Sequence, residues 1–364
     1  MSQKVAKNHE PLVHIVKRTD VSLKKAILIR AIAVLCAIIV CGILFVLLSG
    51  GKDPFAFYRA MFDGSFGTPR RMWRMFHSLA ILLCISLAIT PAFKMRFWNI
   101  GAEGQVLIGG LATVAVMYYC GNVLPTPVLW LVMIVASVLA SAIWAVIPAV
   151  FKAKWNTNET LFTLMMNYIA TQLVLFCINT WVTSGSGVLA PMKEFGLPTV
   201  VNAWVLNIIT VVVLTVFVYV YLRFSKQGYE ISVVGESENT ARYIGINVKK
   251  VIIRTMVISG ALCGVAGLLL VGGTDYTISA NTVGGQGFTA IMVSWLGKFN
   301  PLYMVLTSFL IVFLQSGAKQ VSTVFNLNES ISDIITAVIL FFIIGCEFFI
   351  NYKLVFRKSV KEEK

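Results

Sequence analysis

Charged side chains are scarce in this sequence: Asp, Glu, Lys and Arg make up 13% of its 364 residues, whereas 58% are hydrophobic. Acidic side chains are the scarcer kind, with 16 Asp and Glu against 30 Lys and Arg, so the net charge is +14. Together with a mean hydropathy of +0.83, this composition excludes an ordinary water-soluble globular domain. We therefore expect lipid to surround most of the chain.

The sequence also lacks the motifs of motors and metalloenzymes. It contains no G-x-x-x-x-G-K-[ST], which excludes the usual phosphate-binding loop of an ATPase in this chain. The segment HEPLVH places His9 and His14 five residues apart, which does not match the H-E-x-x-H spacing of a zinc helix. The seven cysteines occur singly, with no C-x-x-C pair, and read as small buried apolar residues. We expect no metal, no cofactor bound by this chain and no catalytic residues.

Carboxylates are rare deep inside the apolar segments. Glu103 and Glu159 lie near the start of such segments, and Asp333 and Glu347 lie near the two ends of the last one. Ion-coupled carriers usually need a carboxylate near the middle of the bilayer, where a charge costs about 2.5 to 3.5 kcal/mol on insertion scales. This distribution argues against a secondary transporter.

Long apolar runs dominate what is present. A bilayer core of about 30 Å requires about 20 apolar residues in a helix. We predict ten membrane segments, near residues 26–48, 76–93, 98–119, 127–150, 160–182, 201–223, 251–272, 287–297, 301–317 and 330–350. The first, Ala26–Leu48, is too long for the core of a signal peptide and should remain as a membrane helix.

One predicted segment, Gly287–Gly297, is too short to cross a bilayer as a helix. Its backbone would need hydrogen-bond partners from neighbouring protein, so we expect a broken or re-entrant element. Asn300-Pro301 would form the turn that leads to the next helix.

The distribution of basic residues predicts the orientation. With ten crossings, 23 of the 30 Lys and Arg residues fall on one side and 7 on the other. Because cytoplasmic loops carry the excess of basic residues, both termini should be cytoplasmic, as basic tails 1–25 and 351–364. Anionic lipid headgroups explain this charge without nucleic acid. Several of the seven basic residues on the outer side lie in Phe55–Trp73, a segment whose pattern predicts an amphipathic helix at the membrane interface.

Residues 224–250 form a polar stretch between two predicted membrane helices that is too long for a simple connection. Ser237–Tyr243 can form a short helix that begins near Glu236 or Ser237 and ends at Gly245. A short helix on the cytoplasmic side has a suitable shape for the groove of a partner protein. The loop belongs to the predicted transmembrane domain, residues 26–350, which lies between the two basic tails.

Four segments in sequence order carry a family resemblance. GYEISVVGESENTARYIGI (228–246) resembles the coupling loop of ABC importer permeases of the branched-chain amino acid, ribose and nucleoside group. FWNIGAEGQVLIGG (97–110) resembles a signature of the nucleoside and simple-sugar branch, and NETLFTLMMNYIA (158–170) and GGQGFTAIMVSWLGKFNPL (284–302) are similar to two further segments of that branch.

The resemblance implies an all-α polytopic membrane protein of type II importer architecture, with about ten helices in two inverted halves around a central pathway. It implies a permease subunit that imports nucleosides into a bacterium through the plasma membrane, with a simple sugar such as ribose or galactose as the alternative substrate. Its partners would be a second permease, identical or homologous, two ATPase subunits that bind ATP and Mg, and a lipid-anchored substrate-binding protein outside. The residues expected to contact the ATPase are Gly228, Tyr229, Glu230, Gly235, Glu236, Asn239, Ala241, Arg242, Tyr243 and Gly245.

Within that loop, Glu236 and Arg242 are the strongest candidates for presenting charge to the ATPase. The alternative is that they belong to a solvated loop surface without a partner.

Asn99, Glu103 and Gln105 lie at the start of the third apolar segment. They either line the translocation pathway or brace it through hydrogen bonds, while Gly101 and Gly104 permit close backbone approach. A simpler reading is that Glu103 favours the positive N-terminal end of its own helix, which is worth about 0.3 to 1 kcal/mol.

Other polar residues have similar alternatives. Asn158-Glu159-Thr160 is either a pathway or partner element, or Asn158 is simply the N-cap of the fifth segment. The amide of Asn167, inside that segment, needs a partner and reads as a helix-to-helix contact or a pathway residue. Phe288 and Thr289 are pathway candidates, because irregular backbone in transporters often lines the cavity. Gly260 and Gly264 form a G-x-x-x-G pair that should pack helices together.

Overall fold

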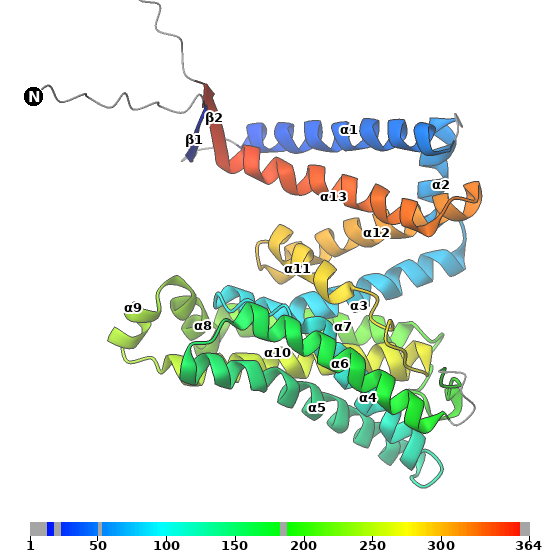
Figure 1. The fold of residues 1–364 in the computed structure, drawn as a ribbon, viewed down its shortest axis with the longest axis vertical. Helices are drawn as coiled ribbons and strands as arrows, with labels where there is room; N and C mark the ends of the chain where they lie inside the picture. The colour runs from blue at the N-terminus through cyan, green and yellow to red at the C-terminus, as the bar shows by residue number, and fades with distance from the viewer. Residues whose placement is uncertain (1–12, 18–22, 50–52, 183–187, 357–364) are drawn as a thin grey trace, which may run out of the picture. The chain divides into compact units, whose positions relative to one another are not determined.

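The computed structural model describes residues 13–17, 23–49, 53–182 and 188–356, and these are mostly helical (Figure 1). The helices are α1 (Leu23–Leu48), α2 (Pro54–Phe66), α3 (Pro69–Lys94), α4 (Ala102–Cys120), α5 (Thr126–Trp155), α6 (Glu159–Trp181), α7 (Val205–Phe224), α8 (Lys226–Glu236), α9 (Glu238–Tyr243), α10 (Val248–Leu270), α11 (Gln286–Leu296), α12 (Pro301–Phe325) and α13 (Glu329–Asn351). Short turns of 3-10 helix (Lys193–Phe195) and π-helix (Val271–Asp275) complete the helical elements. The strands are β1 (Val13–Lys17) and β2 (Tyr352–Phe356).

In the part of the chain that the structure describes, seven helices are long and apolar enough to cross a membrane: α3, α5, α6, α7, α10 with its π-helical turn, α12 and α13. The predicted class, a helical multi-pass membrane protein, is confirmed. The predicted number of ten segments stays a prediction, since α4 and α1 do not meet the same measure along their described residues.

The chain divides into two compact units, Phe66–Phe313 and the pair of segments 1–65 and 314–364. In the larger unit, α10 packs against α3, α4 and α5. The apolar windows of α3 and α10 are 78% buried, whereas those of α5 and α7 are 28% buried. Thus α3 and α10 form the centre of this unit, and α5 and α7 present apolar surface for lipid.

Side-chain caps fix several helix starts. Asn158 accepts a hydrogen bond from the Leu161 N–H and caps α6, as predicted. Ser237 caps α9 in the same way, and Asn247 caps α10. The predicted segment beginning at residue 76 is longer in the structure, because α3 begins at Pro69 with Thr68 as its N-cap. The separate helix α2 ends at Phe66.

Helix α11 has 11 residues, as the short segment Gly287–Gly297 suggested. At about 1.5 Å per residue it is roughly 17 Å long, about half of a bilayer core. Left-handed backbone at Gly284 and Gly285 precedes it. Lys298 and Phe299, also left-handed, follow it and lead to Pro301 at the start of α12. The predicted short helix and turn are therefore present.

In the smaller unit, α1 packs against α13. The strands β1 and β2 pair antiparallel, with Val13 opposite Phe356 and Lys17 opposite Tyr352. This pairing was not expected from the sequence. It places a described segment of the N-terminal tail beside one of the C-terminal tail.

Candidate functional site

Asn99 is the centre of a buried polar network in the larger unit. Its amide nitrogen lies 3.3 Å from both the Gln105 Oε1 and the Ser259 Oγ. Its amide oxygen accepts hydrogen bonds from the Gln105 Nε2 and the Gly101 N–H, each at 3.1 Å. Asn99 and Gln105 are both almost completely buried. The two amides therefore satisfy one another inside an apolar bundle, where an unpaired polar group would be costly.

A second contact joins the start of α4 to α6. The Asn167 Oδ1 accepts a hydrogen bond from the Gly104 N–H at 2.8 Å, and its Nδ2 donates to the Ile100 carbonyl at 2.9 Å. The Thr163 hydroxyl accepts from the Ile100 N–H at 3.2 Å. A Cβ at Gly104 would lie 2.9 Å from the Cα of Asn167, and one at Gly101 would lie 3.1 Å from the Thr163 Cβ. Small residues thus allow the two backbones to meet.

Glu103 binds the start of the short helix α11. Its Oε1 accepts a hydrogen bond from the Gly285 N–H at 2.8 Å, and its Oε2 accepts one from the Gly287 N–H at 2.7 Å. A Cβ at Gly287 would lie 2.5 Å from the Glu103 backbone nitrogen. The carboxylate therefore supplies acceptors and negative charge to the positive end of α11, in addition to lying in the first turn of its own helix.

The two pathway candidates on α11 follow this contact directly. The Thr289 hydroxyl donates to the Gly285 carbonyl at 3.3 Å, and the Phe288 side chain is 42% exposed. The structure thus brings Asn99, Gln105 and Asn167 together around the start of α4, while Glu103 links the same turn to α11.

Gly260 and Gly264 lie on the face of α10 that packs against α5. A Cβ at Gly260 would lie 2.5 Å from the Ala145 Cβ, and one at Gly264 would lie 2.5 Å from the Ser137 carbonyl oxygen. The Ser137 hydroxyl donates to the Gly264 carbonyl at 2.7 Å.

Sequence reasoning missed several members of this network: Thr163, Ser137, Ser141, Ser259, Gly285 and Gly287. Their common signal is a small residue, polar or glycine, within or beside an apolar helix, and this signal is too frequent in membrane proteins to select them.

The polar loop 224–250 contains two helices, α8 and α9, where one was predicted. The expected end of α9 is present as a paired backbone motif: the Gly245 N–H donates to the Arg242 carbonyl, and the Ile246 N–H donates to the Ala241 carbonyl. Gly245 has a φ of +85°, which glycine adopts without a side-chain penalty.

Apart from Glu230, which is partly buried, the residues expected to contact the ATPase divide into two groups. Gly228, Gly235 and Ala241 are buried against the rest of the unit. A Cβ at Gly235 would overlap the Lys94 carbonyl oxygen, and one at Gly228 would lie 2.5 Å from the Tyr221 carbonyl oxygen. The exposed group consists of Tyr229, Glu236, Asn239, Arg242, Tyr243 and Gly245.

Two ion pairs order the charges of this region. Glu230 on α8 pairs with Arg254 on α10 at 2.9 Å, both partly buried. Arg242 pairs with Glu238 on the same helix at 3.1 Å, both exposed. Glu230 thus fixes α8 to α10, whereas Glu236 and the exposed ring of Tyr243, at 92% exposure, remain on the outer surface. We call the exposed group above the α8–α9 surface.

Among the described residues, no group of three or more His, Cys, Asp or Glu side chains is placed to hold a metal ion. The buried polar network consists of hydrogen bonds between helices, and the α8–α9 surface is an exposed polar feature of the same unit.

These features define an integral membrane protein whose helices are joined by buried amides and whose largest polar loop presents two short helices. The family model described as branched-chain amino acid transport system / permease component matches residues 72–344, and the chain belongs to this family. As a permease component of an ABC transporter it is not an enzyme, and the ATPase activity lies in a separate subunit. Membership also implies a substrate-binding protein as a partner.

Three curated relatives match over most of their lengths. The glucose ABC transporter permease protein TsgB13 of Haloferax volcanii is 28% identical, and the match covers 88% of each chain. The guanosine ABC transporter permease protein NupP of Bacillus subtilis is 29% identical, over 87% of this chain and 92% of that protein. The nucleoside ABC transporter permease protein NupB of Lactococcus lactis is 25% identical, over 93% of this chain and 95% of that protein.

Proposed function

We propose that this chain is the translocating subunit of an ATP-driven importer of nucleosides in a bacterial plasma membrane. The observation that carries the substrate class is that relatives named for guanosine and for nucleosides match 87% and 93% of the chain. The buried network at the N-I-G-A-E-G-Q segment lies within the matched family region.

A simple sugar is the second candidate substrate. The glucose permease from Haloferax volcanii matches at an identity similar to that of the guanosine permease, 28% against 29%. An ion-gradient-driven carrier has no comparable support, because the family is that of a transport system whose ATPase is a separate subunit.

The proposed membrane arrangement has ten crossings in two inverted halves, with both termini in the cytoplasm. The pairing of β1 with β2 supports this, since two paired strands lie on one side of a membrane and require an even number of crossings. The bias of 23 basic residues to 7 supports the cytoplasm as that side. The proposed domains are the tails 1–25 and 351–364 and the transmembrane permease domain 26–350.

We propose that the α8–α9 surface contacts the ATPase, which holds ATP and Mg. Exposed Tyr243 and Glu236 would supply an apolar ring and a charge to that subunit, while buried Gly228, Gly235 and Ala241 hold the surface against the membrane helices. The other proposed partners are a second permease and a substrate-binding lipoprotein outside the cell. No nucleic acid is proposed.

The polar residues at the start of α4 would brace the pathway. Asn99 and Gln105 are buried and use their amide groups on one another, which leaves them poorly placed for direct contact with substrate. Glu103 and Asn167 would hold α4 against α11 and α6. Phe288 and Thr289, on the first turn of α11, are the proposed lining residues.

Competition during uptake tests the substrate class. Cells that carry this chain with its genomic neighbours would be given radiolabelled guanosine, with unlabelled uridine, glucose or ribose as competitor. We expect uridine to reduce guanosine uptake and the sugars to leave it unchanged. Labelled glucose uptake that guanosine does not reduce would move the proposal to the sugar candidate.

A further inference from the structure

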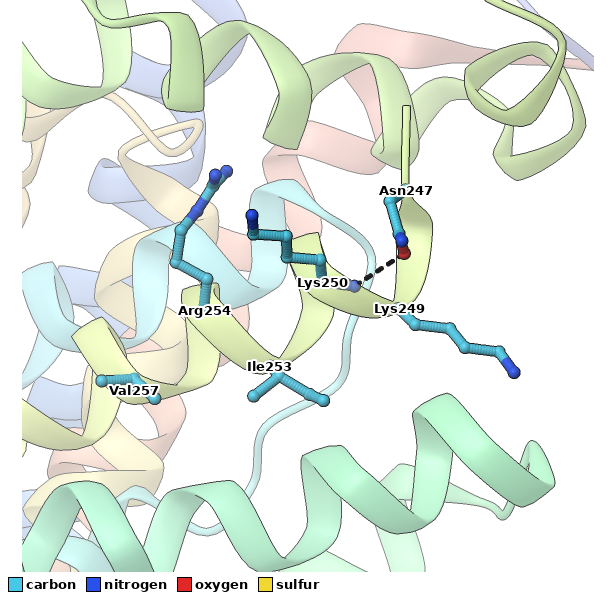
Figure 2. A pocket seen from close by; sticks show the side chains of 6 residues that line it. All are labelled: Asn247, Lys249, Lys250, Ile253, Arg254 and Val257. Carbon is cyan, nitrogen blue, oxygen red and sulfur yellow. Dashed lines mark hydrogen bonds between the residues drawn. The ribbon is translucent and has the colours of Figure 1, made fainter. Parts of the chain in front are cut away.

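A groove with a mostly apolar surface, bordered by lysine and arginine side chains, lies at the first turns of α10. Of its lining residues, Asn247, which caps α10, and Arg254 take part in the contacts described above. The groove has a volume of about 580 Å³ and is lined by Asn247, Lys249, Lys250, Ile253, Arg254 and Val257 (Figure 2). We call it the Lys249 groove. Its lining divides into cationic side chains at the start of the helix and apolar side chains further along.

Helix geometry explains this division. Lys249, Ile253 and Val257 are spaced four residues apart and share one face of α10, which spans about 12 Å at 1.5 Å per residue. Lys250 and Arg254 are also four apart and point together toward another side (Figure 2). An amphipathic molecule lying along this face would meet charge at one end and hydrocarbon at the other.

The charges of the groove are only partly compensated within the protein. Arg254 pairs with Glu230, yet its buried Nε has no hydrogen-bond partner among the described residues. Among the described residues, no ion pair includes the groove lysines Lys249 and Lys250, or Lys154 at the nearby end of α5. Both groove lysines are exposed. An anion bound here would therefore gain cations that no carboxylate already occupies.

A neighbouring cavity of about 240 Å³ extends the basic character toward the end of α5. It shares Lys249 with the groove and is also lined by Lys152, Lys154 and Arg242. The two carboxylates near these cations already have partners, because Lys152 pairs with Glu159 at 2.9 Å and Arg242 pairs with Glu238 at 3.1 Å. Lys154 and Lys249 thus converge from two helices on one region.

The location fixes the kind of anion. The groove lies at the polar end of a candidate membrane span, Val248–Asp275, and the cavity lies at the end of another, Thr126–Trp155. The ends of such spans lie at the level of lipid headgroups. Trp155 at this end of α5 is exposed, and its ring centroid lies 5.2 Å from that of Phe151 with the rings tilted by 40°. Tryptophan is enriched at membrane interfaces.

We propose that the Lys249 groove binds one anionic phospholipid, with its phosphate at Lys249 and its acyl chain along Ile253 and Val257, while Lys250 adds positive charge from the neighbouring face of α10. The lipid would bind beside α8, which Arg254 fixes through Glu230, and so would stabilise the base of the α8–α9 surface. The site does not depend on which solute the protein transports.

Lipid retention by the purified full-length protein tests the site. The protein in neutral detergent is titrated with phosphatidylglycerol or with phosphatidylcholine of the same acyl chains, and bound lipid is counted by native mass spectrometry. The wild type should retain phosphatidylglycerol in preference. Because each basic side chain strengthens binding to anionic lipid about fivefold, Lys249→Gln with Lys250→Gln should weaken it about 25-fold.

Two matched variants distinguish lipid binding in the groove from non-specific attraction of anionic lipid to a positively charged protein. Lys226→Gln with Lys353→Gln removes the same charge from exposed positions outside the groove and should leave retention unchanged. Lys249→Arg with Lys250→Arg should also retain the lipid. Equal retention of the two lipids by the wild type, or equal losses in the control and groove variants, would overturn the proposal. So would displacement of phosphatidylglycerol by millimolar inorganic phosphate, which would assign the groove to a free anion.

Discussion

The contact between Glu103 and the start of α11 permits a direct test of how the short helix is held. The Glu103 carboxylate accepts hydrogen bonds from the Gly285 and Gly287 N–H groups at 2.8 and 2.7 Å. Glu103→Gln keeps the shape of the side chain but replaces one acceptor oxygen with an amide N–H₂ group. That group would face a backbone N–H, so that two donors meet with no acceptor between them.

The two hydrogen bonds of Glu103 determine how much stability the Glu103→Gln variant should lose. Hydrogen bonds to a charged group contribute about 1.5 to 3 kcal/mol each, and a neutral one about 1 kcal/mol. The variant keeps one neutral bond and loses the other, together with the interaction between the carboxylate and the helix dipole. We expect the free energy of unfolding to fall by about 2 to 6 kcal/mol. The start of α11 should loosen before the rest of the unit.

A thiol-reactive dye can follow this change on heating the detergent-solubilised protein. Cys84 and Cys263 are buried and free, so they react only when the helices around them separate. Glu103→Gln should lower the melting midpoint. Glu194→Gln should not, because it changes an exposed carboxylate that has no ion pair with any residue the structure describes. If Glu103→Gln melts and transports like the wild type, the carboxylate does not hold α11 and the reasoning is refuted.

Three further predictions concern the other contacts. Gly264→Ala should destabilise the α5–α10 packing by about 1 to 3 kcal/mol, because its Cβ would lie 2.5 Å from the Ser137 carbonyl oxygen. Gly345→Ala should have no effect in the same melting assay, because its Cβ would have no described atom within 4 Å. Asn167→Ala should cost about 1 to 3 kcal/mol by leaving the Gly104 N–H unpaired, and an unchanged midpoint would contradict this. Tyr243→Ala should reduce uptake and the ATPase activity of the assembled transporter without changing the melting midpoint, since the ring is 92% exposed, while Tyr243→Phe should retain both activities.

Local signals in the sequence predicted local structure. The Asn158 cap, the short helix before Gly245 and the half-length helix after Gly285 each depend on residues within a few positions of one another. Their backbone geometry is set by capping groups, glycine and chain length, which a single sequence displays.

Contacts across long separations were not predictable in the same way. Glu103 meets N–H groups 182 and 184 residues further along the chain. Helix α8 was missed because Gly228 and Gly235 lower helix propensity by about 1 kcal/mol each relative to alanine. In the folded unit the same glycines let α8 approach the Tyr221 and Lys94 carbonyl groups, so packing outweighs that local preference.

Transport by proteoliposomes tests the central claim most directly. The chain would be reconstituted with its ATPase, the proposed second permease and its binding protein, with ATP and Mg supplied on the ATPase side and labelled guanosine on the other. The account predicts guanosine accumulation that requires ATP hydrolysis and persists when proton and sodium gradients are abolished. Accumulation that follows an ion gradient, or that proceeds unchanged without ATP, would contradict it.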